Sequence, residues 1–340
     1  MAIKKVILSI DGGGIRGIIP GQILLHTEKL LQEISGDKDR RIADHFDLIA
    51  GTSTGGILSC AYLMPGKDGR PKYKAPEVVN IYFERGQEIF TNTLMHRIKS
   101  LGGVLDEKYT AEGLEKALKD YFGNTKLNEL LKPTLITAYD IRRRRAKFFT
   151  QHDAHKENEN FYVRDITRAT ASAPGYFQVA NIRSMDKKLY PLIDGGVFAN
   201  NPAMCAYAEV RKASKRANNT VTAAEMAMLS LGTGYARNSY KHKDAQHWGL
   251  AEWMVPLVDI MMSGVSETVD YELMQLFDTT GHPEQYVRIN GELKNQDASM
   301  DNVAPENFKA LEKFGNTLFK KNRKKIKDFL EMTLTCIIHE

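Results

Sequence analysis

The segment Phe46-Asp-Leu-Ile-Ala-Gly-Thr-Ser-Thr-Gly55 joins an apolar run of strand length to a turn bounded by glycines. Residues 57–63 then continue as the beginning of a predicted helix. Gly51-Thr-Ser-Thr-Gly55 fits the pattern G-x-S-x-G, in which a serine on a strained turn between strand and helix exposes its hydroxyl group. The segment therefore predicts a strand-turn-helix unit with Ser53 as a candidate nucleophile. The alternative is that Ser53 only caps the following helix.

The same alternation recurs elsewhere in the chain. Val6–Ile10 is a predicted buried strand, Asp11 to Gly17 a turn, and Ile18 to Ile34 an amphipathic helix. Further strands are predicted at Thr134–Tyr139, Lys147–Thr150, Leu189–Ile193 and Met228–Leu231. Strands that alternate with helices in this way predict an α/β fold, in which helices flank a largely parallel sheet.

Composition and charge restrict the class of protein. The 340 residues are 42% hydrophobic and 26% charged, which is typical of a globular protein. No run approaches the roughly 20 apolar residues of a spanning helix, and the apolar residues 6–10 are too few for a signal peptide, so we expect a cytoplasmic protein. The formal net charge of +5 is compatible with transient peripheral contact with a membrane and is weak evidence for nucleic-acid binding.

The three cysteines do not form a metal or disulfide pattern. Cys60, Cys205 and Cys336 are far apart and odd in number, and they lack the spacing of zinc ligands. We therefore expect buried structural thiols, and we expect no metal and no cofactor.

The glycine-punctuated pattern fades after about Tyr235. We predict a catalytic part at residues 1–235 and a mostly helical part at residues 236–340, which either belongs to the same unit or is appended to it. The segment Glu306 to Leu334 carries apolar residues at helical spacing. Basic residues gather on it at Lys320, Lys321, Arg323, Lys324, Lys325 and Lys327. We interpret this cluster, and the run Arg142 to Arg145, as solvated surface rather than as binding sites.

Asp11-Gly-Gly-Gly-Ile-Arg-Gly17 supports two interpretations. Consecutive glycine N–H groups near a helix start can form an oxyanion hole for acyl transfer. Alternatively, Gly12, Gly14 and Gly17 fit the dinucleotide pattern G-x-G-x-x-G and would cradle a phosphate. The acidic ribose partner of that pattern should follow roughly 20 residues later. That spacing falls near the end of a predicted helix, which weakens the nucleotide interpretation.

Asp194-Gly-Gly196 places an aspartate at another predicted strand end. Alone, the motif is explained by an ordinary Asp-Gly turn. Three downstream histidines have the order required for a Ser-Asp-His triad, namely His242, His247 and His282. However, that fold normally places its serine after several strands, whereas Ser53 follows only one earlier predicted strand.

Taken together and in this order, the three motifs at 11–17, 51–55 and 194–196 resemble the signature of patatin-like phospholipases. Two further stretches resemble the same family, the segment Ala169-Thr-Ala-Ser-Ala-Pro-Gly-Tyr-Phe177 and the strand before Gly232-Thr-Gly234. The resemblance covers about Lys5 to Gly234.

This resemblance implies a three-layer α/β/α sandwich around a mostly parallel sheet. It implies a Ser–Asp dyad without histidine, in which Ser53 is the nucleophile and Asp194 accepts its proton. Gly12, Gly13 and Gly14 would shape the oxyanion hole. The other positions of the motifs are Asp11, Arg16, Gly17, Gly51, Gly55, Gly195 and Gly196. Arg16 would stabilise the glycine loop or bind a phosphate.

The substrate would accordingly be a phospholipid or another lipid ester, cleaved through an acyl-enzyme. An aspartate with a pKa near 4 is a weak base for serine. We therefore expect a dry site in which preorganised glycine donors supply much of the acceleration. As a further hypothesis, the region after Tyr235 restricts access or senses a regulatory ligand.

Overall fold

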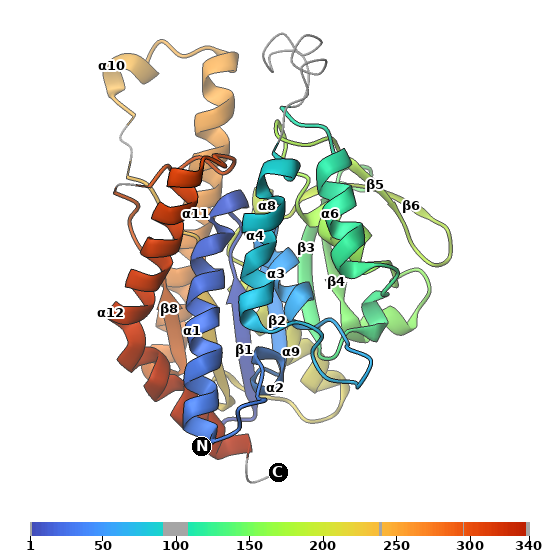
Figure 1. Cartoon of the computed structure of the whole chain (residues 1–340), viewed down its shortest axis with the longest axis vertical. Helices are drawn as coiled ribbons and strands as arrows, with labels where there is room; N and C mark the ends of the chain where they lie inside the picture. Colours follow the sequence, from blue (N-terminus) through green and yellow to red (C-terminus); the bar gives the residue numbers. More distant parts are fainter. Residues whose placement is uncertain (1, 91–107, 238–239, 295, 338–340) are drawn as a thin grey trace.

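The computed structural model describes residues 2–90, 108–237, 240–294 and 296–337 (Figure 1). Their strands form one eight-stranded sheet in the order β5-β6-β3-β2-β1-β7-β8, with β4 also paired to β3. The bounds are β1 Lys5–Ile10, β2 Leu48–Thr52, β3 Thr134–Asp140, β4 Arg145–Thr150, β5 Ala180–Arg183, β6 Leu189–Asp194, β7 Met226–Leu231 and β8 Tyr286–Ile289. The five strands from β3 to β8 along this order run parallel, and β4, β5 and β6 are antiparallel to their neighbours. The predicted mostly parallel sheet is confirmed.

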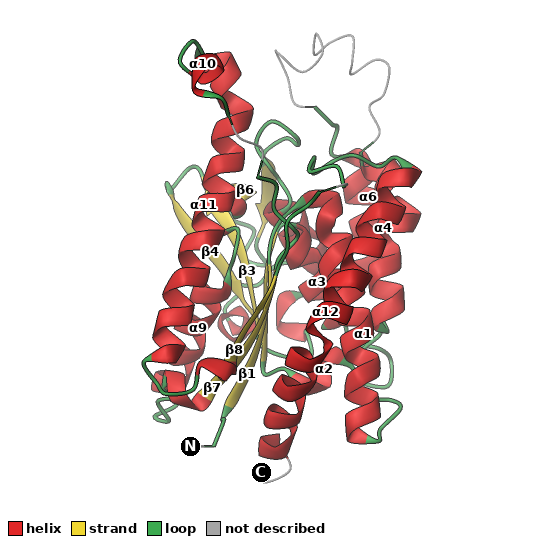
Figure 2. Ribbon diagram, turned by 90° about the vertical axis from the view of Figure 1, so that its left-hand side faces the viewer, coloured by secondary structure: helices red, strands yellow, loops and turns green. Residues whose placement is uncertain are grey.

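Helices cover both faces of the sheet. The longer ones are α1 Ile18–Ser35, α3 Thr54–Tyr62, α4 Ala75–Ile89, α6 Glu112–Phe122, α7 Val163–Thr170, α9 Ala203–Arg216, α11 Leu250–Asp278 and α12 Pro305–Ile337. The short ones are α2 Ile42–His45, α8 Gly196–Ala199 and α10 His242–Ala245. Figure 2 shows the sheet between a layer with α1, α3, α4 and α12 and a layer with α9 and α11. The three-layer α/β/α sandwich is confirmed.

Side-chain alternation along β1 builds the two cores. Leu8 and Ile10 belong to the cluster under α1, whereas Ile7 belongs to the cluster with α9 and α11. Successive residues of a strand point to opposite faces of the sheet. A central strand that is covered on both faces is therefore apolar without interruption, which explains the run that the sequence shows.

Residues after 235 contribute to this same sheet and core. β8 pairs with β7 in parallel, and α12 packs against α1 through buried Leu311 and Phe319. The helix predicted from Glu306 is confirmed, whereas β8 was missed. Its four residues Tyr-Val-Arg-Ile are too few for a periodic pattern. Residues on both sides of position 235 therefore pack into one core. The predicted division into a catalytic part and a mostly helical part stays a prediction.

The basic cluster on α12 is largely exposed to solvent, with only Lys327 half-buried, and the run at 142–145 forms an exposed turn. Cys60 is buried and Cys205 is half-buried, whereas the side chain of Cys336 lies outside the described part of the structure. None of the helices in the described ranges has the length and apolarity that a membrane span requires.

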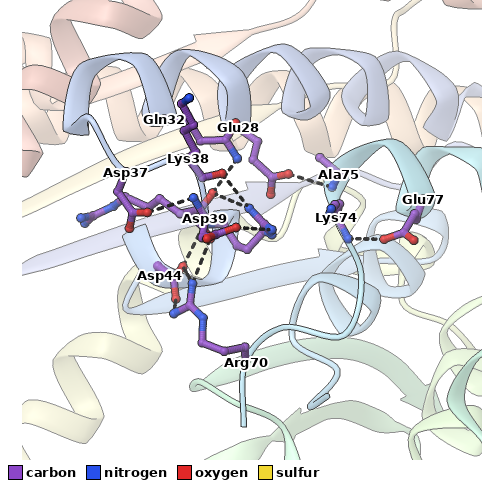
Figure 3. Close-up of polar contacts among 12 residues, drawn as sticks. Glu28, Gln32, Asp37, Lys38, Asp39, Asp44, Arg70, Lys74, Ala75 and Glu77 are labelled. Atoms are coloured by element: carbon purple, nitrogen blue, oxygen red, sulfur yellow. Dashed lines mark hydrogen bonds and ion pairs between the residues drawn. The ribbon is translucent and has the colours of Figure 1, made fainter. Parts of the chain in front are cut away.

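Glu28 on α1 connects the starts of two other helices, and Figure 3 shows its contact with Ala75 at the start of α4. Its buried carboxylate accepts the N–H of Ala75 at 3.0 Å and the N–H of Ile42 at 3.2 Å. The first N–H groups of a helix have no partner within the helix, so a buried start needs an acceptor of this kind. Burial raises the pKa of Glu28, and the two N–H groups partly offset that effect. Glu28 thereby fixes α2 and α4 against α1.

Glu28→Gln should lower the free energy of unfolding. The amide replaces one carboxylate oxygen with a donor, which leaves one buried N–H group unpaired at a cost of about 1–3 kcal/mol. Urea denaturation followed by circular dichroism measures the change. Glu77→Gln is the matched control. Glu77 accepts the N–H of Lys74 next to the same helix start, but both of these residues are exposed to solvent. An equal loss in both variants would contradict the role of Glu28.

Candidate active site

Ser53 and Asp194 lie together because two strands meet end to end along β3. β4 pairs along one edge of β3, so β2 and β6 share the other edge. β2 runs parallel to β3 and ends with Thr52 opposite Thr137, whereas β6 runs antiparallel and ends with Asp194 opposite Ala138. The two strand ends therefore occupy neighbouring positions, and the residue after Thr52 is Ser53.

The turn at Ser53 has the strained geometry that the motif predicts. Ser53 has φ 53° and ψ −123°, which is rare for a residue with a side chain. A Cβ atom at Gly51 would collide with the carbonyl of Gly55, and one at Gly55 with the carbonyl of Ile10. The turn therefore requires glycine at both positions. The Ser53 side chain makes no capping hydrogen bond to α3, so capping does not explain this serine.

Asp194 is a buried carboxyl group beside Ser53. The N–H of Gly196 donates to its carboxylate at 2.7 Å, and the Ser53 hydroxyl lies near enough to lower its pKa as a hydrogen-bond donor. Burial raises the pKa of Asp194 to about 7, and these hydrogen bonds only partly lower it. Burial therefore moves the pKa of this aspartate away from the ordinary value near 4, at which it would be a weak base for serine. A carboxylate with a pKa near neutrality is the better proton acceptor.

The segment Ala169–Phe177 holds both groups in place. The hydroxyl of Thr170 accepts the Ser53 N–H at 2.8 Å, and the carbonyl of Ser172 accepts the Asp194 N–H at 3.0 Å. In the sequence, this stretch resembles the family but has no assigned role. Its hydrogen bonds to Ser53 and Asp194 show that it lies at the junction of β2 and β6.

The glycine loop passes beside Ser53. The Gly12 N–H donates to the carbonyl of Asn200 at 3.0 Å, and Thr233 donates to the Gly12 carbonyl at 2.7 Å. Gly14 has φ 57°, and a Cβ atom there would collide with the carbonyl of Met300. In the described part of the chain, the N–H groups of Gly13 and Gly14 have no acceptor. The N–H of Gly12 is therefore engaged by Asn200, whereas the N–H groups of Gly13 and Gly14 are free to donate within the described residues.

Two arginines brace this loop. Arg288 on β8 forms an ion pair with Asp11 through both terminal nitrogens of its guanidinium group, one of them at 2.8 Å. The same group also donates to the hydroxyl of Ser230. Burial lowers the pKa of Arg288, but the carboxylate of Asp11 overrides this, and the net shift is upward. Arg16 donates through Nε to the Gly13 carbonyl at 3.4 Å. Arg288 was missed in the sequence, because no motif surrounds it.

An apolar pocket of about 90 Å³, open at its mouth, lies over Ser53 and Asp194. Its walls come from far-apart segments, including Ile57, Phe177 and Met261. A neighbouring groove mixes apolar side chains with charged ones, including Asp11, Arg16 and Arg288, and it shares Tyr176 and Met262 with the pocket. The pocket suits a long apolar group whose reactive atom reaches Ser53.

The described histidines do not complete a triad. None of them lines the pocket; His242 and His247 are exposed, and His282 is half-buried. One group of potential metal ligands occurs among the described residues, namely His152, Asp153 and Glu209. Lys212 contacts both of its carboxylates and Arg216 contacts Asp153, so cations already neutralise this group. It is better explained as an ion-pair network.

Comparison with known proteins agrees with this geometry. The profile of the family described as "Patatin-like phospholipase" matches residues 8–207, which are 200 of the 340 residues. The chain belongs to the patatin-like phospholipase family. Patatin-like protein 2 of Oryza sativa subsp. indica is 34% identical over 93% of this chain and 84% of its own length. Patatin-T5 of Solanum tuberosum is 31% identical over 93% of this chain and 84% of its own length.

Among solved structures, VipD from Legionella pneumophila aligns with a TM-score of 0.41 and 12% identity, over 95% of this chain and 66% of that one. A similarity this weak does not bear on the fold or the function. Membership of the patatin-like family supports lipid acyl hydrolysis as the function. The nucleotide-binding interpretation of residues 12–17 has no support, and its expected acidic partner falls at the end of α1.

Arg288→Met should destabilise this patatin-like protein, because it leaves the Asp11 carboxylate buried without a counterion. Breaking a buried pair on one side typically costs about 3–5 kcal/mol. Urea denaturation measures the loss. The double variant Asp11→Asn with Arg288→Met is the control, because it removes both charges and should recover part of the stability. A single variant that is as stable as the native protein would refute the bracing role.

Proposed function

We propose that the protein hydrolyses lipid esters with Ser53 as nucleophile and Asp194 as its only general base. The observation that carries the proposal is that these two side chains lie together in the lining of one apolar pocket, at neighbouring strand ends. Asp194 accepts the hydroxyl proton as the Ser53 oxygen attacks the ester carbonyl. Collapse of the tetrahedral intermediate expels the alcohol, which takes up that proton, and leaves an acyl-enzyme. Water, activated by Asp194, then releases the fatty acid.

The oxyanion of the intermediate would be held by the N–H groups of Gly13 and Gly14. Both lack another acceptor within the described residues, and the loop that presents them is held on two sides by Thr233 and Arg288. Donors that are fixed before the reaction need no reorganisation when charge develops. Gly12 supports the loop through Asn200 instead.

The pocket favours the acyl chain as the part of the substrate that binds there. Its lining is almost entirely apolar apart from the reactive groups, whereas the adjoining groove also contains charged side chains. An ester at the boundary would place its chain in the pocket and its alcohol portion toward the groove. Such a substrate resides in a lipid phase, and we therefore infer transient contact of the protein with a membrane.

Residues 1–235 carry the proposed catalytic groups, and the region after them completes the pocket. Val258, Met261 and Met262 on α11 form part of its wall. The hypothesis that this region restricts access is consistent with that position. Deletion of residues 236–340 would not test it, because β7 and α1 would lose the elements that cover them. Point substitutions on α11 are the appropriate test.

Ser53→Ala and Asp194→Asn should each reduce hydrolysis of a long-chain ester by about 10⁴-fold or more, as the loss of a nucleophile or its base does in serine hydrolases. The experiment measures fatty acid release by the purified variants. A fluorophosphonate probe should label the native protein once, at Ser53, and should not label Ser53→Ala. Substantial turnover by either variant would contradict the dyad. Saturable nucleotide binding without labelling would revive the nucleotide interpretation.

The rate should depend on pH through Asp194. Its pKa is raised to about 7, so the carboxylate that accepts the proton is lost as pH falls through that value. We expect kcat/KM for a soluble ester to fall about tenfold per pH unit below 7 and to level off above it. The same shift makes ionisation of Asp194 unfavourable for folding. Asp194→Asn should therefore raise the Tm more at pH 8 than at pH 5. A rate that is flat down to about pH 5 would contradict the assignment.

A further inference from the structure

The first half of α11 exposes an apolar surface beside the mouth of the pocket. Figures 1 and 2 show α10 and the start of α11 projecting beyond the other described helices and strands, at the end opposite the two termini. The structure describes eleven large hydrophobic side chains as exposed, and five of them lie in this projection. These five, which we call the apolar tip, are Tyr240, Trp253, Leu257, Ile260 and Met261.

The apolar tip is a continuous face rather than a scatter of residues. Trp253, Leu257, Ile260 and Met261 follow the i, i+4, i+7 and i+8 spacing of one helix face. Trp248 packs edge-on against Tyr240 at 5.3 Å and against Trp253 at 5.0 Å between ring centroids. Both tryptophans of the chain therefore belong to this projection. An exposed face of this kind marks an interaction surface.

The pocket identifies the partner that this face fits. Val258, Met261 and Met262 on the adjacent face of the same helix line the pocket, and Met261 belongs to both faces. An acyl chain that moves from a lipid phase into the pocket should not cross water, because every exposed methylene costs free energy. Because the pocket mouth is continuous with the apolar tip, the acyl chain can pass from the lipid phase into the pocket without contact with water. Tryptophan and tyrosine also favour the interface between lipid and water.

Charge does not explain the surface. Residues 235–262 contain three basic side chains, Arg237, Lys241 and Lys243, and three acidic ones, Asp244, Glu252 and Asp259. Their formal charges cancel, so attraction to anionic head groups is not the main contribution. The basic cluster of α12 lies on another element and is not needed for this contact.

We propose that the apolar tip inserts into the lipid–water interface and holds the pocket mouth against the acyl chains. This inference rests on the proposed function only in taking the substrate to be a lipid ester. It assigns the membrane contact to α11 and predicts that apolar burial, rather than net charge, drives it.

The first experiment measures docking without turnover. The Ser53→Ala protein is mixed with vesicles of phosphatidylcholine brominated on its acyl chains, and its tryptophan fluorescence is recorded. We expect a blue shift and quenching that persist at raised salt. Trp253→Gln with Ile260→Gln in the same background should abolish vesicle binding in a flotation assay. The matched control is Tyr271→Gln with Leu189→Gln, because these residues are 64% and 39% exposed and line neither the pocket nor the groove. Tyr271 lies about 18 residues, or roughly 27 Å, along the helix from Trp253.

The second experiment separates docking from chemistry in the active enzyme. The tip variant should hydrolyse p-nitrophenyl butyrate, which is dissolved in water, like the native protein, and should hydrolyse vesicle phosphatidylcholine at least about tenfold more slowly. The control pair should change neither rate. Absence of quenching, or native vesicle hydrolysis by the tip variant, would overturn the proposal. A third outcome would also overturn it: light scattering shows that the native protein is a dimer, and the tip substitutions dissociate the dimer while vesicle binding persists. Failure of the proposed function would appear differently, as a native protein that hydrolyses neither substrate.

Discussion

β2 and β6 approach each other along one edge of β3 and end at neighbouring positions, opposite Thr137 and Ala138. A parallel strand and an antiparallel strand that share an edge must leave a junction, and the backbone must turn away from the sheet on both sides of it. Ser53 and Asp194 are the residues at that junction. Their proximity depends on the pairing of the sheet, and the segment Ala169–Phe177 accepts a hydrogen bond from the backbone N–H of each of them.

Burial at this junction has two chemical consequences. It raises the pKa of Asp194 toward neutrality, which suits the proposed role of this carboxylate as a lone base. It also surrounds the site with apolar side chains, where the proposed interaction of fixed N–H groups with an oxyanion would be stronger than in water. The Asp11–Arg288 pair serves the same end by fixing the loop that carries those groups. The site therefore depends on the packing of strands that lie far apart in the sequence.

Much of the fold could be predicted from local patterns. The strands at Val6 and Met228 and the helices from Ile18 and Glu306 are long or apolar enough to stand out, and all are present. β8 could not be predicted, because its four residues include an arginine whose partner is 277 positions away. The part of the pocket wall on α11 was also missed, because the exposure of its methionines depends on the residues that pack beside them.

The sequence by itself determined the elements and the candidate groups, because strained turns need glycine and strand ends offer the positions from which side chains react. Gly51, Gly55 and Gly14 could be recognised by that steric requirement alone. Only the tertiary structure decided that Gly12 is engaged by Asn200, that Asp194 titrates near neutrality and that Arg288 holds Asp11. These properties depend on burial and on contacts between distant segments, which no local pattern of residues encodes.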